Sequence, residues 1–445
     1  MFPVDFRNQR GGLRPTGCRQ LSGYDRALAK RILLTTTGSL GDLHPYLAIG
    51  LGLKARGHSV TIATSNLYRA KIERTGFEFT PMGPHFESFS PELMREVMDA
   101  RKGPEHLIRK ILYPAAPAIY GEVMDALRGA DVVVTHPITF ASQIAAEKTG
   151  MPWVSTVTAP LSLMSKYDPP VIAPAQFLAK LRNFGPGVNG VIVQLAHLKT
   201  KPWMKPITQF RASLGLPRGQ DPLYEGQHAP RRVLGMFSRV MAEPQPDWPP
   251  QARVIGFPFY DQAEHGQTLP AGLEAFLDAG PPPVVFTLGS SAVLDAGTFY
   301  EESLDAVRRL GCRAVLLAGG NVIKSPLPAG TEVFAYAPYS KILPRAACVV
   351  HQGGIGTCGQ TLAAGRPMLV MPYAFDQPDN AARLGRLGVA RSIRRREYTG
   401  RRAAAELDRL LKDGSYAKRA AEVAHLVSAE DGVSAACDAI EECAG

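Results

Sequence analysis

Residues 348–364, CVVHQGGIGTCGQTLAA, carry the most informative pattern of the chain. Four residues typical of a buried strand precede three glycines within residues 353–356, and helical spacing follows from about Thr357 to Ala364. Glycines let the backbone approach a ligand closely, and the first amides of a helix lie unpaired at the positive end of its dipole. The stretch therefore predicts a strand, a turn and a helix. Together they either bind an anion or form a tight turn without a ligand.

The same order of strand, turn and helix recurs on both sides of this stretch. Apolar, β-branched runs predict strands over residues 32–37, 59–64, 131–135, 152–157, 284–288, 314–318 and 368–372. Helical spacing over residues 45–56 joins the first two of them. Apolar strands separated by helices are typical of a parallel sheet covered on both faces. We therefore predict the α/β class, with two Rossmann-like, doubly wound domains facing a central cleft.

A chain of 445 residues is too long for one ordinary core, so we divide it. We expect a poorly ordered basic leader over residues 1–29, an N-terminal domain over 30–257, a linker over 258–282, a C-terminal domain over 283–425, and a last helix over 426–445 that packs back on the N-terminal domain. Residues 160–230 lose the regular rhythm. They are expected to form helices and loops that either shape an acceptor pocket or cover the sheet.

The formal net charge of +10 allows a nucleic-acid or membrane partner. Basic residues gather before residue 31 and over residues 391–402, without the interleaved aromatics that stack on single strands. We therefore favour a solvated basic surface and expect no nucleic acid.

The six cysteines include no CxxC pair and no zinc-like cluster with histidine, which favours a reduced, cytoplasmic protein without a metal. No apolar run reaches the roughly 18 to 20 residues of a membrane helix, and the first 29 residues lack the apolar core of a signal peptide. Peripheral membrane contact stays open.

Other phosphate-binding classes fit less well. The chain has no GxxxxGK[ST] motif, so a P-loop is not expected. Residues 38–41, GSLG, depart from GxGxxG, and the strand after them ends without an acidic residue for a ribose. This counts against an NAD-dependent dehydrogenase.

Three segments in order, YAPY at 336–339, HQGGIGT at 351–357 and DQPDN at 376–380, resemble the donor-binding signature of GT-B-fold, family 1 glycosyltransferases. This is the UDP-glycosyltransferase superfamily, and the resemblance runs over residues 31–430. It implies a nucleotide sugar on the C-terminal domain, an acceptor on the N-terminal one, no metal, and inversion at the anomeric carbon.

The resemblance further implies a hexosyltransferase that moves glucose from UDP-glucose to a hydroxyl of a small hydrophobic acceptor, such as a phenolic, a sterol or a lipid. A dTDP-rhamnose donor, a nucleotide-sugar epimerase and a non-catalytic nucleotide-sugar-binding protein are the alternatives. We expect a monomer or weak dimer.

Carried over to this sequence, the resemblance assigns roles to the matching positions. They are Tyr336 and Ala337 for the base, Ser290, Gly354, Gly356 and Thr357 for the diphosphate, Gln360 for the ribose, and Asp376 and Gln377 for the sugar. One position departs from the family pattern, because Gln352 aligns with its diphosphate histidine and His351 comes one residue earlier. Neighbouring strand residues point to opposite faces, so either Gln352 donates to the phosphate or a rearranged turn presents His351; we favour Gln352.

Inverting transfer needs a base for the acceptor hydroxyl, and the family's base aligns with Asp42 in GDLHP, residues 41–45. An exposed aspartate has a pKa of about 3.9, and burial beside an apolar acceptor would raise it. Alternatively Asp42 only caps the next helix. Because proline prefers the first helical position, Pro45 favours His44 as the cap and leaves Asp42 in the loop. We predict Asp42 as the base, His44 as the second candidate, and His136 in the acceptor site.

Overall fold

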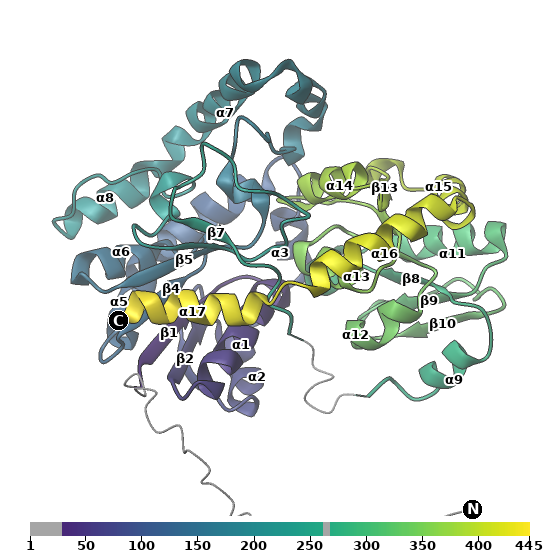
Figure 1. Cartoon of the computed structure of the whole chain (residues 1–445), viewed down its shortest axis with the longest axis horizontal. Helices are drawn as coiled ribbons and strands as arrows, with labels where there is room; N and C mark the ends of the chain where they lie inside the picture. The colour runs from purple at the N-terminus through teal and green to yellow at the C-terminus, as the bar shows by residue number, and fades with distance from the viewer. Residues whose placement is uncertain (1–28, 261–267) are drawn as a thin grey trace, which may run out of the picture.

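The computed structural model describes residues 29–260 and 268–445, and each half of this described chain is built on a parallel β-sheet (Figure 1). The first sheet has the order β3-β2-β1-β4-β5-β6-β7 and the second the order β10-β9-β8-β11-β12-β13. The predicted fold class, two doubly wound α/β domains, is confirmed.

The strands of the first sheet are β1 (Arg31–Thr35), β2 (Ser59–Thr64), β3 (Glu78–Pro81), β4 (Val132–Thr135), β5 (Trp153–Val157), β6 (Val233–Gly235) and β7 (Ala252–Val254). Those of the second are β8 (Val284–Thr287), β9 (Ala314–Leu317), β10 (Thr331–Phe334), β11 (Cys348–His351), β12 (Met368–Val370) and β13 (Ala390–Ser392). Every residue of the central strands β4, β8 and β11 is buried, as their continuous apolar sequences predict.

The α-helices of the N-terminal half are α1 (Leu40–Ala55), α2 (Arg69–Arg74), α3 (Pro91–Val97), α4 (Gly103–His106), α5 (Tyr113–Ala126), α6 (Phe140–Thr149), α7 (Pro186–Thr200) and α8 (Lys205–Ser213). A π-helix, η2 (Leu107–Leu112), joins α4 to α5. The region 160–230 forms helices and loops as expected, including the 3-10 segments η3 (Pro160–Leu163), η4 (Ala173–Phe184), η5 (Lys201–Met204) and η6 (Glu225–Gln227).

The C-terminal half holds α9 (Leu273–Asp278), α10 (Gly289–Ala292), α11 (Phe299–Leu310), α12 (Tyr339–Ile342), α13 (Ile355–Ala363), α14 (Gln377–Arg386), α15 (Gly400–Lys412), α16 (Gly414–Ser428) and α17 (Gly432–Ala444). The 3-10 turns η8 (Val293–Asp295), η9 (Leu343–Arg345) and η10 (Arg395–Glu397) accompany them. Helix α9 lies within the expected linker over 258–282, of which residues 261–267 lie outside the described part. The expected leader over 1–29 lies outside it too, except for its last residue.

The end of the chain returns to the N-terminal domain (Figure 1). One helix was expected over residues 426–445. The segment instead contains the end of α16, at Ser428, and the whole of α17, which begins at Gly432. Cys437 and Ile440 of α17 are fully buried in one cluster with Leu47 of α1, and Arg56 donates to Asp438 across the same contact. The chain thus crosses between the domains twice. Phe257, on the first crossing, shares a buried cluster with Val427, next to the second.

Candidate active site

The glycine-rich turn joins the buried strand β11 to α13, at the carboxyl edge of the second sheet. Gly353 has a φ of +89°, and a Cβ atom there would lie 2.8 Å from Cγ1 of Val370, so no other residue fits without strain. Gly354 is the N-cap of α13. The first amides of α13 therefore have no partner within the helix and form a site for an anion.

His351 and Gln352 have different environments. The ring of His351 is fully buried, its Nδ1 accepts the amide of Gly353 at 3.0 Å, and burial lowers its pKa to about 3. The amide group of Gln352 lies beside the turn after β8, since a Cβ at Gly289 would come within 2.4 Å of its Nε2. His351 thus stabilises the glycine-rich turn from within the core. Gln352 lies between that turn and the turn after β8, and both carry expected diphosphate contacts.

Asn380 connects this turn to Asp376. Its fully buried side chain donates to the carbonyl of Gly353 at 2.9 Å and to Oδ2 of Asp376 at 2.7 Å. Burial raises the pKa of Asp376 to about 7; the bond from Asn380 opposes this rise and the charge of Asp42 adds to it. Asn380 thus fixes Asp376, the expected sugar-binding residue, against the glycine turn.

The other expected donor contacts lie around the same edge. Gln377 is buried, and its Oε1 accepts the amide of Tyr373 at 2.9 Å, which leaves its Nε2 as a donor. Ser290 is exposed at the start of α10, while Thr357 is buried and Gln360 half-buried on α13.

The expected base contacts follow β10. Tyr336 exposes 45% of its surface, as a ring that stacks on a base requires. Ala337 is fully buried in the core cluster beside α12, so its backbone rather than its methyl group is the part available to a ligand.

The start of α1 differs from the expectation based on Pro45. The helix begins at Leu40 with Ser39 as N-cap, and Pro45 lies inside it. Oδ2 of Asp42 accepts the amide of Ser39 at 2.7 Å and its hydroxyl at 3.1 Å, which completes a capping box. The prediction that His44 caps the helix and leaves Asp42 in a loop is therefore wrong, because the capping box satisfies the first donors and starts the helix earlier.

Asp42 also faces His136, which follows β4. Nε2 of His136 lies 3.3 Å from Oδ1 of Asp42, while its Nδ1 accepts the amide of Ile138 at 3.4 Å. In its neutral form the ring therefore carries its proton on Nε2, toward the carboxylate. Thr139 fixes this loop, accepting the amide of His136 at 3.0 Å and donating to its carbonyl at 2.8 Å.

This contact changes the electrostatics expected of Asp42. Burial acts to raise its pKa, but the hydrogen bond and charge of His136, with the two bonds from Ser39, outweigh burial and hold the pKa below its ordinary value. The expectation that the pKa rises is wrong, because the carboxylate has positively polarised partners. The group is ionised at neutral pH.

Helix α1 meets α10 and α13 where the domains touch. Asp42, at its N-terminal end, is thereby brought to the glycine turn, and its charge contributes to the raised pKa of Asp376. His44 lies two residues further along, where side chains on a helix do not face the same way. Its ring lies 5.1 Å from that of Tyr260. The structure thus joins Asp42 with His136 and turns His44 elsewhere.

A small apolar hollow of about 10 Å³, room for roughly one water molecule, lies beside the His136 loop. Its lining includes Met82, Leu112, Ile119, Ile138 and Phe140. The assignment of His136 to the acceptor site stays a prediction.

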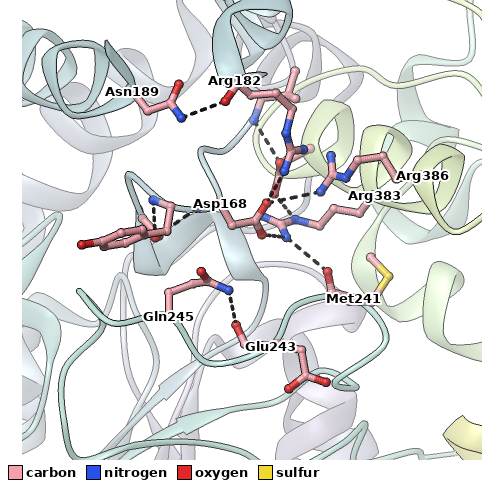
Figure 2. Close-up of polar contacts among 12 residues, drawn as sticks. Asp168, Arg182, Asn189, Met241, Glu243, Gln245, Arg383 and Arg386 are labelled. Carbon is pink, nitrogen blue, oxygen red and sulfur yellow. Dashed lines mark hydrogen bonds and ion pairs between the residues drawn. The ribbon is translucent and has the colours of Figure 1, made fainter. Parts of the chain in front are cut away.

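A buried ionic cluster holds the donor helix α14 to the N-terminal domain (Figure 2). Asp168, between η3 and η4, accepts from Arg383 and, at 2.7 Å, from Arg182, while Arg386 lies 3.5 Å away. Arg383 is 3% exposed and also donates to Asp379 at 2.7 Å and to the carbonyl of Met241. The amide of Val171 adds a bond of 2.9 Å to Asp379. We call Asp168, Asp379, Arg182, Arg383 and Arg386 the Asp168 cluster.

The Asp168 cluster ties α14 to the N-terminal domain through Arg383 and Asp379. Burial, together with the guanidinium groups of Arg182 and Arg383, lowers the pKa of Arg386 to about 10. Asp376 and Gln377 lie at the start of this helix, so contacts made by the acceptor-side region position the residues expected to bind the sugar. No pattern in the sequence indicates this cluster, because its members come from distant segments.

Within residues 29–260 and 268–445, no group of His, Cys, Asp and Glu is arranged to hold a metal ion. No helix of this part is long and apolar enough to cross a membrane. Cys312, Cys348, Cys358, Cys437 and Cys443 are free thiols.

Comparison with known proteins gives matches to both halves. Residues 32–165 match the glycosyltransferase family 28 N-terminal domain, and residues 302–437 match the erythromycin biosynthesis protein CIII-like C-terminal domain. The chain is 34% identical over 427 residues to O-mycaminosyltylonolide 6-deoxyallosyltransferase of Streptomyces fradiae, covering 93% of this chain and 97% of that enzyme. Sterol 3-beta-glucosyltransferase of Leptosphaeria maculans is 28% identical over 80% of this chain, which spans 25% of that protein's length.

Solved structures agree in fold. The glycosyltransferase of kitacinnamycin superimposes with a TM-score of 0.70 at 24% identity, covering 94% of this chain and 100% of that one. The glycosyltransferase VinC, in complex with dTDP, has a TM-score of 0.63 at 18% identity, covering 93% and 99%.

Proposed function

Because this chain belongs to the GT-B-fold, family 1 glycosyltransferases and is a hexosyltransferase, we propose that it transfers a 6-deoxyhexose from a thymidine diphosphate sugar to a hydroxyl of a large apolar acceptor, with inversion. One observation supports this reaction most directly. Asp42, held by His136 and Ser39, lies where the N-terminal domain meets the glycine turn and Asp376.

A residue of the proposed site can assist each bond change of the transfer. The acceptor oxygen attacks the anomeric carbon as its proton passes to the carboxylate of Asp42, and the bond from that carbon to the diphosphate oxygen breaks. The α13 amides, with Gln352, Ser290 and Thr357, take the negative charge that grows on the leaving diphosphate. The protein thereby supplies the counter-charge that the reaction needs, and we propose no metal.

The low pKa of Asp42 suits this role in one respect. The carboxylate is already ionised at neutral pH, so no proton has to leave before it can accept one. A carboxylate of low basicity takes the proton late, when the new carbon–oxygen bond has acidified the acceptor oxygen. His136 holds the carboxylate by its Nε2 and fixes its orientation; it is a positioning residue.

Two observations support a thymidine nucleotide rather than the uridine nucleotide first expected. Gln360, the residue expected to contact the ribose, has one acceptor oxygen, and a deoxyribose presents one ring hydroxyl fewer than a ribose. The 34%-identical relative is named a 6-deoxyallosyltransferase. The acceptor in that relative's name, O-mycaminosyltylonolide, supports a large apolar acceptor for this chain.

UDP-glucose with a sterol is the second candidate, supported by the 28%-identical sterol glucosyltransferase. A crossed assay separates the two: dTDP-6-deoxyhexoses and UDP-glucose are each incubated with macrolactones and sterols, and the products are analysed by mass spectrometry. We expect glycosides from the thymidine donors and macrolactones. Glucosides formed from UDP-glucose alone would overturn the donor proposal.

A further inference from the structure

Helix α7 lies at the outer edge of the N-terminal domain (Figure 1), and large apolar side chains are exposed along it. Val188, Val191, Leu195 and Leu198 are 41–61% exposed, and Phe184, just before the helix, is 68% exposed. Their spacing of three and four residues places them along one side of the helix. We call these five residues the α7 face.

The opposite side of α7 is occupied by the protein itself. Asn189 is buried and donates to the carbonyl of Arg182 at 3.1 Å, which joins the helix to the Asp168 cluster (Figure 2). Ile192, Val193 and Ala196 are half-buried. The helix is therefore apolar on its inner and outer sides, and no residue of 29–260 or 268–445 covers the outer one.

The surroundings of the α7 face are strongly basic. Between residues 169 and 220 the chain has seven Lys or Arg and no Asp or Glu, a net charge of +7 against +10 for the whole chain. Lys180, Lys199, Lys201 and Lys205 are exposed, and they form no ion pair with any residue in the described ranges. Lysines beside exposed valines and leucines are the composition of surfaces that lie in the headgroup layer of anionic membranes.

We propose that the α7 face is a membrane-contact surface, which inserts shallowly into an anionic lipid bilayer while the neighbouring lysines contact the headgroups. Helix α7 has 15 residues, fewer than the roughly 20 that cross a bilayer, so it lies along the surface. A second copy of the chain is a poorer partner, since a symmetric contact would bring the same unpaired lysines together.

The position of the α7 face gives the contact a consequence for the reaction. Segment η4 leads into α7 and contacts α14, which begins beside Asp376. Lipid at the α7 face therefore lies on the side of the molecule where the acceptor-side region meets the donor helix. Membrane binding itself rests on the face and its lysines, and does not depend on which donor is used.

Vesicle sedimentation tests the proposal with the full chain. We expect it to sediment with vesicles of phosphatidylcholine and phosphatidylglycerol, weakly with phosphatidylcholine alone, and less as salt is raised. The double variant Val191→Glu, Leu195→Glu should bind at least about tenfold more weakly, because two apolar contacts are lost and two repelled charges added. Leu426→Glu, on exposed Leu426 of α16, is the matched control and should bind as the parent does.

A separate pair, Lys199→Glu and Lys201→Glu, tests the charge. It should remove most of the dependence on phosphatidylglycerol. Unchanged dTDP binding and melting temperature in all variants show that the fold is intact. Equal binding by the parent and by Val191→Glu, Leu195→Glu would overturn the proposal. Light scattering gives a second test. If the parent is a dimer and Val191→Glu, Leu195→Glu dissociates it, the α7 face is a protein interface and the proposal is overturned.

Discussion

The donor side and the acceptor side of this enzyme are built differently. On the proposed donor side, the start of α13 offers backbone amides, and the side chains are tied to each other, as Asn380 is to Gly353 and Asp376. The proposed acceptor side offers the ionised carboxylate of Asp42, with Nε2 of His136 3.3 Å from it. A site made from backbone needs particular residues at fixed spacing, whereas an apolar pocket needs only shape. The first leaves a motif in the sequence and the second does not.

The largest expected effect lies on the acceptor side, at Asp42. Asp42→Asn removes the proton acceptor and should lower kcat about 100- to 10,000-fold, while dTDP affinity is nearly unchanged. His44→Gln is the control, because His44 lies apart from the Asp42–His136 pair. Loss of the capping box costs about 1 kcal/mol, so melting curves should accompany the kinetics. Near-normal turnover by Asp42→Asn would contradict the assignment of Asp42 as the base.

The next effect tests whether the two sides are coupled. Arg383→Met leaves Asp168 and Asp379 without their buried guanidinium, and should lower the free energy of unfolding by about 3–5 kcal/mol. Arg386→Met, whose side chain is 39% exposed, is the matched control and should cost much less. In the folded Arg383→Met protein we expect a raised KM for the donor sugar and little change in dTDP affinity. Equal losses for sugar and dTDP would indicate a purely structural role.

The backbone character of the donor side predicts a smaller, sharper effect. Gly353→Ala adds a Cβ atom against Val370 at a positive φ, and should weaken dTDP binding about tenfold or more. Gly121→Ala, on an exposed site of α5 with open space around it, is the control and should leave binding intact. Isothermal titration calorimetry measures both variants. Parent-like affinity in Gly353→Ala would show that the turn does not need its backbone conformation to hold the anion.

His136 provides a pH-dependent test of the acceptor side. His136→Phe removes the donor that holds the pKa of Asp42 low, so that pKa should rise. Because the ionised carboxylate is the active form, the acid limb of the kcat/KM profile should move to higher pH. His136→Asn retains a donor group and should move the limb less. A fall in rate at all pH values, with the limb in place, would contradict the positioning role.

The smallest effect concerns His351 on the donor side. Burial lowers its pKa to about 3, while in the unfolded chain it is about 6.5. The unfolded state therefore binds the extra proton first, and stability is lost as pH falls below about 6.5, by about 1.4 kcal/mol per unit from this group until pH 3 is approached. Melting between about pH 7 and pH 5 should show a shallower dependence in His351→Gln. An unchanged slope would mean that His351 titrates normally.

The sequence predicted the parts that are set by local pattern. The central strands were expected from their continuous apolar residues, and they are buried on both faces. The short β6 and the edge strands β3, β10 and β13 were not expected, because a partly exposed strand carries residues such as Glu78, Glu332 and Arg391. The start of α1 was misplaced because Pro45 was weighed above Ser39 and Asp42, whose capping box sets it.

The site divides in the same way. Glycine turn, Asp376 and Gln377 were expected from their motif, and Asp42 from its alignment. The direction of the pKa of Asp42 was not, since it depends on His136, which arrives from another strand. The Asp168 cluster and the α7 face likewise depend on which distant segments meet. The sequence contains their residues without showing that they are neighbours.

The double crossing of the chain has a consequence for motion. The segments near Phe257 and after Val427 both run between the domains, and they lie against one buried cluster. Two chain segments that connect the domains at the same place allow one domain to rotate about that place. They resist sliding or twisting of one domain against the other. Substrate entry would then be a rotation that lifts Asp42 away from the glycine turn and returns it to the same alignment.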